Sequence, residues 1–341
     1  MVVLTRFLFA ALCAMPALLA GCAPGIPDRG AEARALTAQI RSLPGVAAAS
    51  SDIADSPAQG MVFFRLYVDL ADDITADQAT DITSRYLRNI ASGRYSGYRL
   101  ELDLRRGWNL FAVDSGQLPI ANPAQVISQA RDWVAVRREF PAATVRFRAT
   151  ITHPGGQNPD QDTGHSNLVT LDLPDAADYT AASAVAHTLA ERFPQLATLD
   201  WTIDAGRDHL AEIRTSRRLP TAAELTVFNR LNADQTIPHI DRLRINAPAT
   251  TPVWFAEQTT GSRDTAVAVA LARAHLPVVA TLPGQVLYTA SDELSGHIGA
   301  LGFARGPVAV TVGGCTRHDP LVYLPIPEER RLIARYETCS S

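Results

Sequence analysis

Lysine is absent from this chain of 341 residues, whose 31 basic residues are all arginine. The 35 acidic residues outnumber them, and the formal net charge is −4. A protein that binds nucleic acid needs a basic face to neutralise phosphates, so we expect no nucleic-acid partner. Hydrophobic residues make up 47% of the chain, which excludes extensive disorder and favours a folded body with ordinary cores.

Motifs for catalysis and cofactor binding are also absent. The sequence contains no nucleophile elbow, phosphate loop, paired metal histidines or dinucleotide fingerprint in a suitable setting. His297 and His318, beside Asp319, have residue types found in hydrolase triads, but no sequence feature places them together. We therefore expect no catalytic residue, no cofactor and no metal site.

A polar loop over residues 153–167 offers the best alternative to that expectation. Its possible cation ligands are His153, Asn158, Asp160, Asp162 and His165. The loop departs from the calcium-loop pattern because Gly164 comes one place late, and Val169 stands where a bidentate acid should close the site. We interpret the segment as a polar hairpin loop, with metal binding as the alternative.

The first 22 residues have the anatomy of an export signal. Arg6 is followed by the apolar run 7–18, and the small residues Ala20 and Gly21 directly precede Cys22. This pattern resembles the bacterial lipobox. The resemblance implies a signal peptide over residues 1–21, lipid and palmitate on Cys22, and a lipidated tether over 22–30. It places the protein on the extracytoplasmic side of the cell membrane.

An uncleaved membrane anchor is the alternative for the same segment. A bilayer span needs about 20 apolar residues, and the run here is shorter and interrupted by Pro16.

The remaining cysteines predict a disulfide. Once the leader with Cys13 is removed and Cys22 carries lipid, Cys315 and Cys339 are left in a compartment where disulfides form. Their bond would pin a last helix, over about 328–338, to a strand over 307–312. The alternatives are two free buried thiols, or half of a metal site.

Between residues 30 and 312 the sequence alternates helix-like and strand-like segments. The predicted helices cover about 31–43, 75–92, 122–140, 178–193, 221–234 and 262–276. Thr75 with Gln78 and Thr221 with Glu224 form capping-box patterns at two of the starts. A pair of strand-like runs follows most helices, so the predicted unit is helix, strand, strand.

Similar runs recur about 100 residues apart and predict three repeat modules. Leu100, Leu102 and Leu104 alternate with polar residues as Leu199, Trp201 and Ile203 do. We divide the chain into modules over 31–119, 120–219 and 220–341. The predicted helices over 75–92 and 122–140 each have one apolar stripe, so we predict an α+β protein of two-layer sandwiches with antiparallel sheets.

The first module carries a family resemblance. Residues 43–46 read Leu-Pro-Gly-Val before the first strand, Gly60 opens the second strand, and an alanine-bearing helix surrounds Ala79. Together these resemble the BON domain, a small envelope-associated module. The resemblance implies contact with phospholipid or an envelope protein, without catalysis.

Two hypotheses for function follow. The first is a membrane-anchored, non-catalytic binding or envelope-assembly protein that uses a sheet face or edge. The alternative is an envelope hydrolase with a site assembled from distant residues. Tandem units favour extended contact, whereas an enzyme needs a cleft that breaks the repeat. The glycine-rich stretch 291–306 is the place where we expect such a break.

Overall fold

A computed structural model describes residues 26–56, 61–91, 95, 97–114, 123–150, 168–247, 251–293 and 296–339. The predicted leader, Cys22 and the whole polar loop over 153–167 lie outside these residues.

The chain is a mixed α/β protein. Its described helices are α1 (Gly30–Arg41), α2 (Ala76–Ile90), α3 (Pro123–Glu139), α5 (Tyr179–Arg192), α6 (Ala222–Ala233), α7 (Thr265–Val279) and α8 (Pro327–Tyr336). Its described strands are β1 (Val46–Ser56), β2 (Met61–Leu70), β3 (Arg99–Arg106), β4 (Asn109–Asp114), β5 (Thr144–Thr150), β6 (Leu168–Asp172), β7 (Asp200–Asp204), β8 (Ala211–Thr215), β9 (His239–Ile245), β10 (Val253–Thr259), β11 (Val286–Ser291) and β12 (Ala309–Val312). Each helix from α1 to α7 in this set is followed by two strands.

All of these strands form one sheet, in the order in which they occur along the chain. The two strands after each helix pair antiparallel, as in β3 with β4. Neighbouring pairs are joined in parallel, as in β2 with β3 and β4 with β5. The prediction of purely antiparallel sheets is therefore wrong. A helix between two strands returns the chain to the end where the first strand began, which makes those strands parallel.

Local sequence signals determine where the helices begin. Gln78 N donates to Thr75 Oγ1 at 3.1 Å, and Gln78 Oε1 accepts from Thr75 N at 2.8 Å. The same reciprocal pair forms between Thr221 and Glu224. Both predicted capping boxes are thus present. The predicted end of α7 at Leu276 is wrong, because the helix includes Pro277 in its last turn.

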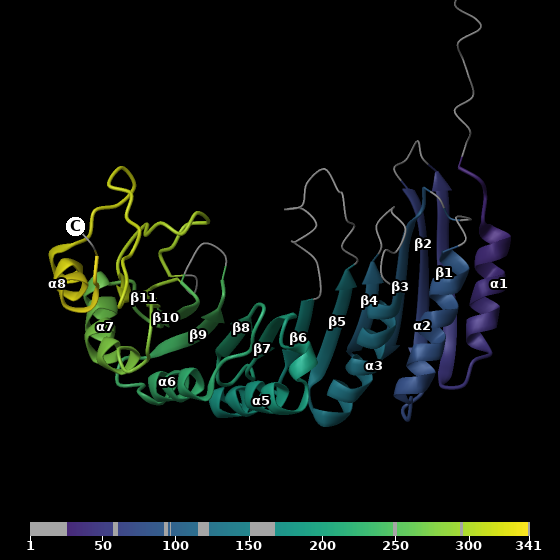
Figure 1. The fold of residues 1–341 in the computed structure, drawn as a ribbon, viewed down its shortest axis with the longest axis horizontal. Helices are drawn as coiled ribbons and strands as arrows, with labels where there is room; N and C mark the ends of the chain where they lie inside the picture. The colour runs from purple at the N-terminus through teal and green to yellow at the C-terminus, as the bar shows by residue number, and fades with distance from the viewer. Residues whose placement is uncertain are drawn as a thin grey trace, which may run out of the picture.

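The core lies between the helices and one face of the sheet. Figure 1 shows the helices along the outer side of a curved sheet, whose opposite face is concave. The buried Trp133 of α3 packs against Phe111 of β4, and its Nε1 donates to Val145 O at 3.2 Å. Trp201 of β7 is buried in the same way against Phe147. Large apolar side chains therefore fix the helices to the convex face.

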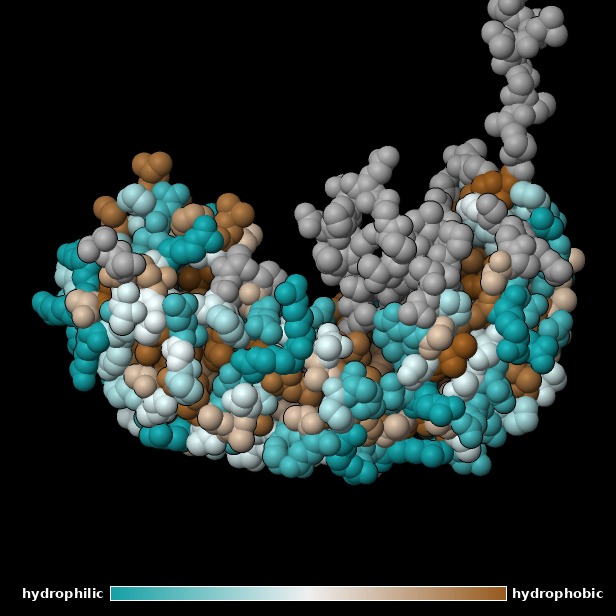
Figure 2. All heavy atoms as spheres, in the orientation of Figure 1, coloured by the Kyte–Doolittle hydropathy of each residue, from teal (hydrophilic) through white to brown (hydrophobic). Residues whose placement is uncertain are grey.

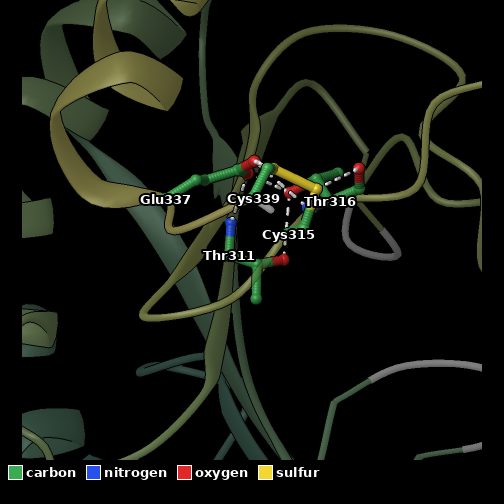
Figure 3. The surroundings of a disulfide bond; sticks show 5 residues. All are labelled: Thr311, Cys315, Thr316, Glu337 and Cys339. Atoms are coloured by element: carbon green, nitrogen blue, oxygen red, sulfur yellow. Dashed lines mark hydrogen bonds between the residues drawn. A yellow bond between two sulfur atoms is a disulfide. The ribbon is translucent and has the colours of Figure 1, made fainter. Parts of the chain in front are cut away.

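Side chains from the C-terminal segment cover the free edge of β12. Glu329 Oε1 accepts from Ala309 N at 3.0 Å, and Glu337 Oε1 accepts from Thr311 N at 2.9 Å. The predicted bond between Cys315 and Cys339 is present beside Glu337 (Figure 3). Backbone donors on an exposed edge strand can pair with another chain, so these carboxylates protect the edge from unwanted association.

Reducing the disulfide should destabilise this end of the molecule. Cys315 and Cys339 are 24 residues apart, and in the chain-entropy model closing such a loop contributes about 3 kcal/mol to the free energy of unfolding. We expect the melting temperature of the purified protein to fall when dithiothreitol is added. Calorimetry checks this, with the Cys315→Ser/Cys339→Ser variant as the control that should not respond to reductant. An equal melting temperature with and without reductant in the wild type would contradict the prediction.

Candidate functional site

The concave face of the sheet carries the polar side chains that alternate with the core residues. In β3, Leu102 and Leu104 are fully buried on the convex side, whereas Glu101 and Asp103 point to the other side and are only partly buried. In β6, Val169 and Leu171 are buried, and Thr170 and Asp172 lie on the concave side. We call this surface the open face.

Ion pairs cross several strands at the N-terminal end of the open face. Arg65 of β2 contacts Glu101 of β3 at 2.6 Å, and Arg99 contacts Glu101 at 2.8 Å. Arg99 also contacts Asp114 of β4 at 2.6 Å, and Arg148 of β5 contacts the same carboxylate at 3.2 Å. The basic and acidic side chains thus form one connected row across four strands.

A second set of ion pairs continues toward the C-terminal end. Arg146 of β5 contacts Asp172 of β6 at 2.8 Å. Glu212 of β8 pairs with Arg214 at 2.6 Å and also with Arg242 of β9. Cross-strand pairs of opposite charge stabilise a sheet modestly, but exposed pairs contribute little to stability. Their larger consequence is an open face that presents charges of both signs.

The open face is hollowed in two places that share one side chain. The larger hollow measures about 1010 Å³ and is lined in part by Trp108, Arg146, Asp172, Asp204, Leu210 and Glu212. The smaller measures about 370 Å³ and is lined in part by Glu101, Asp114, Arg146, Arg148 and Thr170. We call the two hollows together the open-face groove.

Two apolar side chains stand at the rim of the larger hollow. Trp108, in the turn between β3 and β4, is 81% exposed, and Leu210, just before β8, is 57% exposed. An indole exposed to this degree has no role in the core, and aromatic side chains next to charged groups are enriched where proteins bind partners. The groove therefore combines apolar rim contacts with charged side chains in its floor.

Asp204, at the end of β7, lies in the floor of the larger hollow. Burial, together with the negative charges of Glu212 and Asp172, raises the pKa of this carboxyl from 3.8 to about 6. Its ionised form is therefore disfavoured in the folded protein. A ligand that brings positive charge to this point would be favoured.

Replacing Asp204 with asparagine should change how stability depends on pH. Because the folded-state pKa of about 6 exceeds the ordinary 3.8, the contribution of Asp204 to the free energy of unfolding should fall as pH rises from about 4 to about 6. At pH 7 we expect Asp204→Asn to raise the free energy of unfolding by on the order of 1 kcal/mol, allowing for solvent screening. At pH 3.5 the two proteins should be equally stable. Urea unfolding at both pH values measures the difference, with the exposed Asp208→Asn as the control. An equal difference in the free energy of unfolding between Asp204→Asn and the wild type at pH 7 and at pH 3.5 would contradict this prediction.

The stretch expected to break the repeat covers the C-terminal end of the open face. Ile298 packs against an apolar cluster of Trp254, Ala256 and Leu287 on β10 and β11. Trp254 Nε1 also donates to Thr289 Oγ1 at 2.9 Å. At β10 and β11 packed apolar side chains therefore cover the open face beyond the groove. Beyond it, the connection to α8 leaves large apolar residues exposed, and Figure 2 shows hydrophobic atoms projecting at this end.

Of the sequence-predicted candidates for chemistry, those of the loop 153–167 lie outside the described residues, whereas His297 and His318 lie within them. His297 Nε2 lies 3.1 Å from Asp292 Oδ1, whereas neither ring nitrogen of His318 has a hydrogen-bond partner among the described residues. In the described part of the chain, no hydrogen bond joins the two histidines. Arg146 and Arg148, which alternate with the buried Val145 and Phe147 on β5, are exposed and line the groove.

Sequence reasoning missed one group of residues altogether. His239, Glu257 and His275 are buried and close enough to share an ion. They come from β9, β10 and α7, and no local motif links them. Only the folded structure shows that these three side chains are buried next to one another.

No protein-family model, curated protein or solved structure matches this chain. Among the described residues, no helix has the length and apolar character needed to cross a membrane.

Proposed function

We propose that the mature protein is a lipid-anchored, non-catalytic binding protein that acts on the extracytoplasmic side of the cell membrane. Lipid on Cys22 would hold it at the membrane, and the open-face groove would hold an envelope partner. The lipobox-like segment ending at Cys22 supports the location. The Cys315–Cys339 disulfide supports an oxidising compartment.

A repeated architecture fits this proposal. We interpret the helix, strand, strand order as tandem units in the modules 31–119, 120–219 and 220–341, each a two-layer sandwich that shares its sheet with its neighbours. In such arrays each unit contacts mainly the next one, and the curvature produces an extended concave surface suited to binding. The continuous sheet and its concave face support this interpretation.

The row of paired charges within the groove is the observation that carries the proposal. Arg146 lies between the two hollows, with Asp172 at 2.8 Å on one side and Arg148 along the same strand. The groove adds the exposed Trp108 to these charges. A polypeptide segment of an envelope protein, with side chains of both signs and an apolar residue, suits this surface better than a uniformly anionic lipid headgroup.

The hydrolase alternative receives less support. Among the described residues, His297 is oriented by Asp292, but no serine, threonine or cysteine side chain is hydrogen-bonded to His297. A histidine base acts on a nucleophile within hydrogen-bond reach. The groove, in contrast, offers charges and apolar contacts without such a pair.

Reversing the charges that line both hollows should weaken partner capture. We expect Arg146→Glu/Arg148→Glu to reduce the amount of captured envelope protein by about tenfold or more, because two attractive contacts become repulsive. The assay is quantitative pull-down from detergent-solubilised envelopes. Arg88→Glu, on the exposed side of α2, is the matched control and should capture as much as the wild type. Equal capture by the groove variant and the control would contradict the proposal.

A further inference from the structure

A group of polar side chains is buried under the helices at the C-terminal part of the sheet. His239 and Asp241 come from β9, Glu257 from β10 and His275 from α7. Their side chains are 0%, 3%, 0% and 2% exposed, respectively. Ionisable groups are rarely buried so completely unless they are paired or bind a metal.

These side chains converge on one point. One ring nitrogen from each of His239 and His275 and one carboxylate oxygen of Glu257 all lie within 4.8 Å of one another. His275 Nδ1 is 2.7 Å from Glu257 Oε1. Asp241 Oδ2 is 3.2 Å from His239 Nε2, which adds a second carboxylate to the group.

Neighbouring groups orient two of these side chains. His239 Nδ1 donates to the backbone oxygen of Ile237 at 2.6 Å, which turns Nε2 toward Asp241. The Tyr288 hydroxyl donates to Glu257 Oε2 and leaves Oε1 facing His275. Metal-binding histidines and carboxylates are held by outer hydrogen bonds of this kind.

Several atoms of the group lack a hydrogen bond of their own within the described structure. They are His239 Nε2 and both carboxylate oxygens of Asp241, of which Oδ2 faces His239 Nε2 at 3.2 Å, and His275 Nε2, which lies 3.6 Å from Asp234 Oδ2. A buried polar atom without a partner is costly and calls for an explanation. A cation held between His239 Nε2, the Asp241 carboxylate, Glu257 Oε1 and His275 Nδ1 would satisfy the His239 and Asp241 atoms together, while His275 Nε2 faces Asp234.

We propose that His239, Glu257 and His275, with Asp241 as the fourth ligand, form a structural zinc site. Two imidazole nitrogens and two carboxylate oxygens suit the tetrahedral preference of Zn²⁺. Four protein ligands leave no position for substrate, so the ion would be structural. It would tie α7 to β9 and β10.

The metal content of the purified protein tests this proposal. The whole mature chain is extracted in detergent and purified without a metal-affinity tag, and its zinc is measured by mass spectrometry. We expect about one zinc per chain, lost in His239→Asn and in His275→Asn. His187→Asn, which removes a histidine that is 57% exposed on α5, should keep the full amount. Zinc retained in either ligand variant, at the level of the His187 control, would overturn the proposal.

A second set of measurements tests the proposal even if the ligand variants do not fold. Chelator-stripped wild type should gain thermal stability when Zn²⁺ is added, and Co²⁺ should give visible absorption bands of tetrahedral coordination. Tyr288→Phe keeps all four ligands and should bind zinc about 10-fold to 100-fold more weakly. A wild type that purifies without zinc and whose melting temperature does not respond to added Zn²⁺ would show a purely polar network and overturn the proposal.

Discussion

Replacing Cys22 with alanine should abolish the incorporation of palmitate into this protein. The lipobox resemblance makes the Cys22 thiol the acceptor for lipid, and cleavage of the leader depends on that modification. The unmodified precursor should therefore keep residues 1–21. Metabolic labelling with palmitate and the mass of the membrane-bound form measure both effects.

Cys13→Ala is the matched control, because Cys13 lies in the expected leader and is removed with it. This variant should be labelled and processed like the wild type. Mature protein at its normal membrane level in the Cys22→Ala cells would show that the location rests on something other than the lipid.

Truncating Trp201 should have the largest effect on stability. Trp201 is 1% exposed, its ring packs edge-on against Phe147, and its Nε1 donates to Leu196 O at 2.9 Å. Removing such a side chain leaves a cavity and deletes one hydrogen bond to Leu196 O, which still accepts from Leu199 N, so Trp201→Ala should lower the free energy of unfolding by about 3–5 kcal/mol. Denaturant unfolding of the detergent-extracted chain measures the change.

Trp108→Ala is the control for this truncation, since Trp108 is 81% exposed. Its stability should stay within about 0.5 kcal/mol of the wild type. Comparable losses in the two variants would mean that the convex face is not the packed face of the sheet.

Helix positions could be predicted from the sequence because their signals are local. Thr75 with Gln78 and Thr221 with Glu224 satisfy backbone donors within one turn, whatever the rest of the chain does. The alternating leucines of β3 likewise indicate one buried face. The helix departs from the prediction by continuing through Pro277, which lacks the backbone donor for the carbonyl four residues earlier, and it ends two residues later at Val279, where Ala280 N donates to Leu276 O.

The sheet and its groove could not be predicted in the same way. The parallel pairing of β4 with β5 depends on the path of α3 between them. No pattern in the sequence of either strand predicts that path. The contact of Arg148 with Asp114 depends in turn on that strand pairing, because the two residues are 34 positions apart. His239, Glu257 and His275 show the same limit, as they meet only when three elements have packed.

Site-specific photo-crosslinking in intact cells tests the central claim, that the open face binds a partner. A photoreactive residue placed at Thr170 on β6 points into the smaller hollow, and one placed at Arg88 on α2 points away from the sheet. We expect a discrete crosslinked envelope protein from position 170 that disappears with Arg146→Glu/Arg148→Glu, and none from position 88. A partner crosslinked from position 88 and absent from position 170 would place binding on the helical side and contradict the account.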